Sequence, residues 1–165
     1  MGFEILDFSP DDTDGVSDVA VAAFEQYKGI YEDWDVFISR IAAMPSLAES
    51  SEIITAKVED ELVGAVAYVP PHSPKAEFFE PDWAVIRMLV VAPKARGLGI
   101  GKALTEECIK RAKRDRAKTI ALHTSRIMQT ALAMYIRMGF AHKRPAPNIF
   151  GVEYGVYTMG LTEKR

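Results

Sequence analysis

Apolar residues follow two spacings along the chain, and these spacings predict a mixed α/β protein. They recur every three or four positions between residues 16 and 27 and again between 37 and 44, which indicates two amphipathic helices. Runs rich in β-branched residues at 53–58 and 62–69 flank a polar turn and predict an antiparallel hairpin. Extended and helical patterns then alternate through the rest of the chain.

The boundaries of these elements follow from turn residues. Residues 3–8 predict a short first strand, and four prolines between 70 and 82 predict a long loop. We expect a second loop at 145–151. The later elements are expected in the order strand 85–91, helix 101–116, strand 119–123, helix 127–138 and two strands at 140–143 and 153–161.

The composition is typical of one globular domain, expected to span residues 1–165. A chain of 165 residues buries about two-thirds of its unfolded surface. A net charge of -3 argues against general nucleic-acid binding, and no apolar run approaches the ~20 residues of a membrane span. The N-terminal segment lacks the basic and apolar regions of a signal peptide, so we expect a cytoplasmic protein. The basic residues between 110 and 118 are expected to form a solvated helix face.

Cysteine and histidine offer little chemistry of their own. The single cysteine, Cys108, shares a helical stripe with Leu104 and Ala112, which predicts a core position rather than a nucleophile. The three histidines lie far apart in the sequence, without cysteine or carboxylate at the spacing of metal ligands. We therefore expect no metal site.

A glycine-rich turn, Arg-Gly-Leu-Gly-Ile-Gly-Lys at residues 96–102, follows the predicted strand 85–91 and opens a helix. Glycines allow the backbone to approach a ligand, and the free N–H groups of a helix's first turn bind anions. A P-loop is excluded because Ala103 replaces the magnesium-binding hydroxyl. A dinucleotide fingerprint fits poorly, since the glycine spacing differs and residues 119–124 contain no acid. The turn predicts a cradle for another phosphate-bearing ligand.

Two segments, in this order, carry a family resemblance. Arg96, Gly99 and Gly101 match the pattern Gln/Arg-x-x-Gly-x-Gly/Ala, and residues 131–140 match Ala-x-x-x-Tyr-x-x-x-Gly-Phe. Over residues 85–140 the chain resembles the GNAT N-acetyltransferase superfamily. The resemblance implies about seven strands in a mostly antiparallel sheet, helices on both faces, and a splay between the fourth and fifth strands.

The same resemblance implies acetyl-CoA as the cosubstrate. Its pyrophosphate would lie on the backbone N–H groups of the glycine-rich turn, and its pantetheine arm would pair with the fourth strand at Leu89 and Val91. A backbone N–H of Val90 or Val91 would stabilise the oxyanion. The implied cofactor-binding residues are Leu89, Val90, Val91, Arg96, Gly97, Leu98, Gly99, Ile100, Gly101 and Lys102.

Tyr135 matches the family's tyrosine, whose hydroxyl protonates the departing CoA thiolate. Tyr135 also belongs to an apolar helical stripe, so a packing role stays open. The chain departs from the family at Met128, where an asparagine that contacts the cofactor is common. Candidates for the general base are Glu80, Asp82, His123 or an ordered water.

The resemblance implies direct transfer of an acetyl group to a primary amine of a small molecule or peptide. Two alternatives stay open: a module that binds acyl-CoA without turnover, and an enzyme acting on protein lysines or N-terminal amines. Loop shapes decide the acceptor, and the sequence has no readable code for them. The apolar C-terminal strand permits either a homodimer contact or a buried position in the sheet.

Overall fold

A computed structural model of the chain describes residues 2–161. Seven strands form one sheet in the order β1-β2-β3-β4-β5-β7-β6, and every neighbouring pair is antiparallel except β4 and β5, which are parallel. This arrangement confirms the predicted fold class. The strands are β1 Glu4–Asp7, β2 Glu52–Val58, β3 Glu61–Val69, β4 Ala84–Val91, β5 Thr119–Thr124, β6 Ala141–Ile149 and β7 Val152–Gly160.

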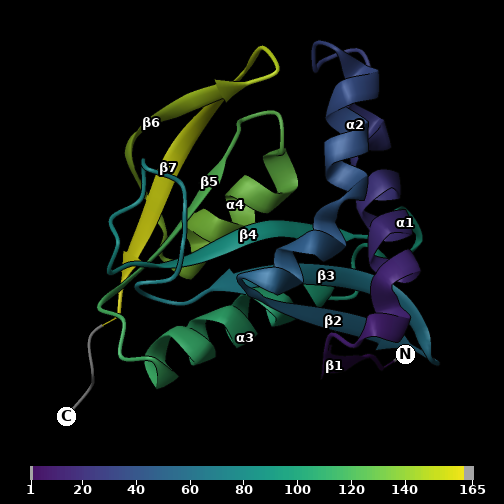
Figure 1. The fold of residues 1–165 in the computed structure, drawn as a ribbon, viewed down its shortest axis with the longest axis horizontal. Helices are drawn as coiled ribbons and strands as arrows, with labels where there is room; N and C mark the ends of the chain where they lie inside the picture. Colours follow the sequence, from purple (N-terminus) through teal and green to yellow (C-terminus); the bar gives the residue numbers. More distant parts are fainter. Residues whose placement is uncertain (1, 162–165) are drawn as a thin grey trace.

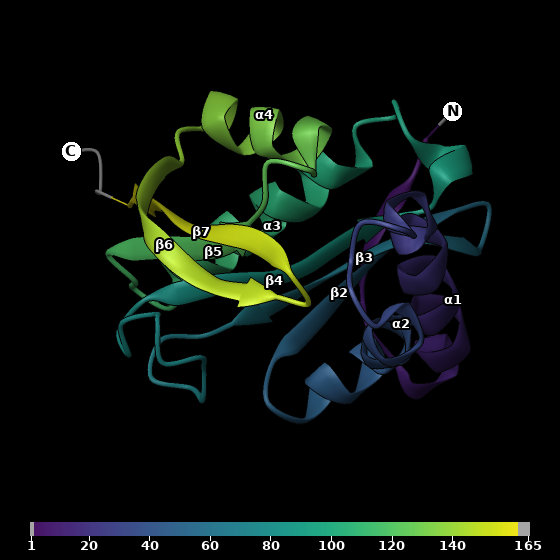
Figure 2. The same ribbon diagram turned by 90° about the horizontal axis from the view of Figure 1, so that it is seen from above.

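Helices cover both faces of this sheet, as expected. Figures 1 and 2 show α1 and α2 on one side and α3 and α4 on the other. The α-helices are α1 Thr13–Phe24, α2 Trp34–Ala42, α3 Ile100–Arg114 and α4 Gln129–Met138. Short 3-10 turns occur at Pro10–Asp12, Glu25–Tyr27, Met44–Glu49 and Pro93–Ala95. Within residues 2–161, no helix has the length and apolar character needed to cross a bilayer.

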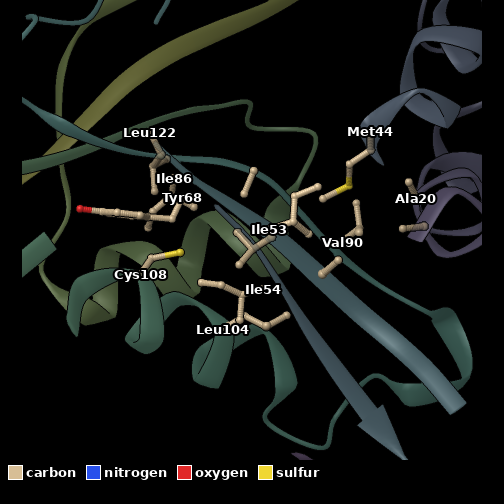
Figure 3. Packing of buried hydrophobic residues seen from close by; sticks show 14 of the residues in the cluster. Ala20, Met44, Ile53, Ile54, Tyr68, Ile86, Val90, Leu104, Cys108 and Leu122 are labelled. Atoms are coloured by element: carbon tan, nitrogen blue, oxygen red, sulfur yellow. The ribbon is translucent and has the colours of Figure 1, made fainter. Parts of the chain in front are cut away.

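The core fills the space between the sheet and its helices (Figure 3). Cys108 is fully buried there, and burial raises the pKa of its thiol, which confirms the predicted core position. Gly64 lets α3 lie close to β3, because a Cβ at this position would come within 2.9 Å of the Ile100 side chain. Close packing on this face fixes where α3 begins.

Two arginines of α3 join the helix to the edge of the sheet. Arg111 forms ion pairs with Asp7 at 2.6 Å and Glu52 at 2.8 Å, and Arg114 pairs with Glu52 and Asp115. The expectation of a solvated basic face at 110–118 is therefore wrong for Arg111, whose side chain is only 14% exposed, whereas Arg114 is exposed as expected although it is ion-paired. Their charges are already neutralised, which leaves them poorly suited to binding a phosphate.

The expected loop at 145–151 is also wrong, because most of it belongs to β6. Pro145 and Pro147 lack the N–H of a ladder residue, but β6 is an edge strand, where proline is tolerated. Only Phe150 and Gly151, both with positive φ, form the turn into β7. β7 lies between β5 and β6, so a position inside the sheet accounts for its two apolar faces.

Candidate functional site

β4 and β5 separate soon after they begin to pair. Their only register partners among the described residues are Ala84 with Ile120 and Val85 with Ala121. From Ile86 to Val91 the backbone of β4 pairs with β3 on one side and has no strand partner on the other. This is the splay that the family resemblance implied, and it exposes an edge to which an extended ligand can add.

A β-bulge interrupts β4 inside the splay, and the sequence did not reveal it. Arg87 lies opposite Ala67 and Val90 opposite Ala65, so Met88 and Leu89 together face Val66. Met88 has φ 55°, a left-handed conformation that costs a side-chain-bearing residue roughly 1 kcal/mol or more. Glycine is the usual mark of such a position, and its absence here left no signal. The bulge breaks the hydrogen-bond ladder beside the expected oxyanion donors Val90 and Val91.

The glycine-rich turn presents a row of free amides at the end of β4. Gly97 and Gly99 have φ values of 83° and 85°, which only glycine adopts without strain, and Gly99 caps α3. Ala103 is the first helical residue whose N–H bonds back, to Gly99 O at 3.0 Å. Among the described residues, no hydrogen bond is donated by the backbone amides of residues 97–102. Arg96, Gly97, Leu98, Gly99 and Lys102 are exposed, whereas Ile100 is buried in the core.

Gly101 lies close to β4 and to α4. A Cβ on Gly101 would lie 3.7 Å from Leu89, 3.8 Å from Met134 and 3.9 Å from Val91, all ordinary contacts. The side chains of Leu89 and Val91 therefore point to the α3 side of the sheet. The start of α3 therefore lies next to Leu89 and Val91 on this side of the sheet.

Tyr135 lies on α4, and its ring packs edge-to-face with Phe140 at 5.7 Å. The residue is 5% exposed, and burial, with a smaller effect of Cys108, raises the pKa of the phenol. Its hydroxyl has no hydrogen-bond partner among the described residues, yet it is not sealed from solvent. The hydroxyl is thus protonated at neutral pH and free to donate.

His123 lies in an aromatic box on the opposite face of the sheet. Its ring is within 6 Å of the rings of Phe78, Phe79 and Tyr154. Burial and the charge of Arg87 lower its pKa to about 4. Its Nδ1 is the one side-chain nitrogen or oxygen of the described chain that is both sealed from solvent and unpartnered. His123 is therefore neutral at physiological pH and a weak base.

The two acidic candidates for the general base are placed differently. Glu80 is exposed and pairs with Arg144 at 3.1 Å. Asp82 is exposed in the loop before β4. Neither carboxylate is held in a buried, unpaired state, so the structure gives neither one the environment of a general base.

The β6–β7 turn and the α1–α2 segment contact each other and form a bridge on the face of the sheet that carries His123. The Glu32 N–H donates to Phe150 O at 2.8 Å, and the hydroxyls of Tyr31 and Tyr154 hydrogen-bond. The Phe150 ring packs against Phe37 with centroids 5.4 Å apart. These contacts join residues more than 100 positions apart, so no local pattern could have indicated them. In Figures 1 and 2 the tip of the β6–β7 hairpin lies near the segment that joins α1 to α2.

A cavity of about 730 Å³ lies beside this bridge. It is bordered by residues 124–127, by parts of β6 and β7, and by Ile30 of the α1–α2 segment. Tyr154 joins the cavity wall to the bridge. None of the glycine-rich turn lines the cavity, so it is separate from the proposed phosphate cradle.

Met128, the departure from the family pattern, occupies the N-cap position of α4. Its sulfur lies 3.7 Å from the Thr124 hydroxyl, and its N–H donates to Ser125 O. The residue closes the turn between β5 and α4 and leaves no amide side chain for a cofactor. Within the described part of the chain, no three histidine, cysteine or carboxylate residues are grouped as metal ligands.

Comparisons with known proteins agree with this geometry. The model of the Acetyltransferase (GNAT) family matches residues 12–140, and a search of curated proteins found no match. PaiA N-acetyltransferase from Thermoplasma acidophilum, solved with coenzyme A, has a TM-score of 0.78 at 19% identity, covering 98% of this chain and 100% of that one.

Two further solved structures share the fold. A GNAT acetyltransferase from Elizabethkingia anophelis, with acetyl-CoA bound, has a TM-score of 0.66 at 20% identity, covering 96% and 98% of the two chains. The ribosomal-protein-S18-alanine N-acetyltransferase from Escherichia coli has a TM-score of 0.70 at 15% identity, covering 99% and 97%. Because the family model spans more than half of its residues, this chain belongs to the acetyltransferase (GNAT) family.

Proposed function

We propose that the protein is an N-acetyltransferase that moves the acetyl group of acetyl-CoA directly to a primary amine of a small molecule or peptide. The observation that carries this proposal is the unpaired edge of β4, which leads from the bulge at Met88 to the free amides of residues 97–102. An extended arm that ends in phosphates matches such a route, because backbone groups bind the arm and the helix N-terminus binds the anion.

Bound acetyl-CoA supplies an activated thioester. The chain's part is to hold the pantetheine at Leu89 and Val91 and the pyrophosphate at residues 97–102. A backbone N–H next to the bulge, that of Val91 in this proposal, stabilises the negative charge on the carbonyl oxygen, because the register of β4 on β3 turns this N–H toward the splay. Tyr135 Oη gives its proton to the departing thiolate, and the raised pKa keeps that proton in place until then. Water removes the proton of the acceptor amine, since Glu80, Asp82 and His123 lack the environment of a base.

The bridge between the β6–β7 turn and the α1–α2 segment limits the acceptor. A ligand that reaches the splay from the His123 face passes beside the Tyr31–Tyr154 pair. A small amine or the end of a peptide fits this approach better than a lysine on the surface of a folded protein. In this proposal the enzyme works in the cytoplasm.

The test is release of free CoA thiol from acetyl-CoA with a panel of polyamines, amino acids, aminoglycosides and short peptides. A blank without amine measures hydrolysis of the thioester. We expect release above the blank with at least one amine, together with an acetylated product of matching mass. Tight binding of acetyl-CoA without thiol release across the panel would contradict the proposed enzyme and indicate a module that only binds acyl-CoA.

A further inference from the structure

Arg87 is a cation on the acceptor face of the splay. Two residues before it, Val85 packs in a cluster with Phe79, Ala121 and Val156. Side chains of a strand alternate between faces, so Arg87 points to the same face as Val85. His123 is two residues after Ala121, the partner of Val85, and therefore shares this face. Arg87 and His123 border the gap between β4 and β5 from its two sides.

Arg87 has no counter-ion. It takes part in none of the ion pairs or side-chain hydrogen bonds among residues 2–161, whereas Arg111, Arg114 and Arg144 each have a carboxylate partner. Its side chain is exposed to solvent, yet burial lowers the pKa of its guanidinium and no nearby acid opposes this effect. An anion that reaches Arg87 therefore has no carboxylate of the described chain to displace.

The location of Arg87 separates it from the phosphate cradle. The cradle follows the C-terminal end of β4, whereas Arg87 precedes the bulge at Met88. In the proposed function, the pantetheine lies along Leu89 and Val91 between the two. An anion at Arg87 is thus on the far side of the thioester, where the acceptor approaches.

We propose that Arg87 binds a carboxylate of the substrate, carried by the amine acceptor. Its guanidinium matches the two oxygens of a carboxylate, and such charge-assisted bonds are strong where water is partly excluded. The neutral His123 beside it neither competes for the anion nor repels it. The acceptor class is therefore an amine that also carries an acid, such as an amino acid. This inference rests on the proposed function.

A carboxylate on the acyl group, as in a dicarboxylic acyl-CoA, presents the same chemistry to Arg87. Two substrate comparisons distinguish these sources. One compares amines that differ only in the acid, tyrosine with tyramine and lysine with cadaverine, using acetyl-CoA. The other compares succinyl-CoA with acetyl-CoA, using tyramine. Wild type, Arg87→Gln, Arg87→Lys and the control Lys143→Gln are measured in each. Lys143 is exposed on the edge strand and outside the proposed site.

In wild type we expect a higher kcat/KM for the substrate that carries the carboxylate than for its partner without it. Arg87→Gln should reduce this preference at least tenfold, because a hydrogen bond to a charged group contributes about 1.5–3 kcal/mol. Arg87→Lys should keep part of the preference, and Lys143→Gln all of it. A loss confined to the succinyl-CoA comparison would assign the carboxylate to the acyl group. An unchanged preference in both comparisons would overturn the proposal.

A binding measurement separates this inference from the proposed function. With CoA present, the amino acids should raise the melting temperature of wild type and not that of Arg87→Gln. If no amine is acetylated but this difference appears, the carboxylate site stands and the proposed reaction fails. If acetylation occurs and the amino acids stabilise both proteins equally, the proposed function stands and the role of Arg87 fails.

Discussion

Tyr135 combines a buried ring with a hydroxyl that has no partner and still reaches solvent. A purely structural tyrosine ordinarily pairs its hydroxyl when buried. The free hydroxyl supports the role of proton donor, which the sequence suggested through the resemblance.

Tyr135→Phe should lower kcat by roughly 10²-fold, the usual contribution of general acid catalysis, and leave the dissociation constant of acetyl-CoA close to wild type. Steady-state kinetics and calorimetric titration measure the two quantities. Phenylalanine keeps the ring contact with Phe140, so a thermal melt should show an intact fold. Wild-type turnover in the variant would reduce Tyr135 to packing.

His123 makes stability depend on pH in a predictable direction. Its pKa is lowered from 6.5 to about 4 on folding, so between these values the unfolded chain binds more protons than the folded one. The free energy of unfolding should therefore decrease as the pH falls from 7 to 5.

Urea unfolding of wild type and His123→Phe at pH 7 and pH 5 checks this effect. Phenylalanine fits the aromatic box and cannot be protonated, so the variant should lose less stability than wild type over the same interval. Equal losses in the two proteins would show that His123 is not buried in its neutral form.

The β4–turn–α3 unit is the element whose backbone conformation the sequence predicts best. Gly97 and Gly99 carry the positive φ values that only glycine adopts without strain, so spacing and conformation agree. Gly101 acts differently: its φ is ordinary, and its missing side chain leaves room beside Leu89 and Val91.

Gly101→Glu should abolish detectable acetyl-CoA binding, because the side chain would enter the path along β4 and bring a negative charge to the cradle. Folding should be unaffected, since an acid in the first helical turn is favourable. Gly160→Glu is the matched control, because a Cβ there meets nothing within 4 Å. Titration calorimetry and thermal melts compare the variants, and normal binding by Gly101→Glu would exclude this path.

Other elements were beyond the reach of local patterns. The prolines at 145 and 147 predicted a loop, because the sequence does not say that β6 lies at an edge. The bulge at Met88 has no glycine to indicate it, and the direction of Arg87 depends on strand pairing. The Tyr31–Tyr154 bridge joins residues distant in the sequence. What could be predicted rests on neighbours in sequence, and what was missed rests on tertiary register.

At the scale of the whole molecule, the two faces of the sheet beside the splay carry different groups of candidate residues. The α3 and α4 face carries the cradle, Gly101 and Tyr135, and the opposite face carries Arg87, His123 and the bridge. The gap between β4 and β5 connects them. In the proposed function, a thioester held along β4 meets an acceptor that arrives from the other side of the sheet, which requires the cofactor to lie in the splay.

Amide hydrogen exchange with and without CoA tests this placement of the cofactor most directly. We expect CoA to slow exchange in residues 88–91, where one side of β4 has no strand partner, and in residues 97–102, whose amides have no partner among the described residues. The segments around the separate cavity, residues 124–127 and 151–155, should change less. Protection confined to those segments, or none in residues 88–91 and 97–102, would contradict the placement of the cofactor in the splay.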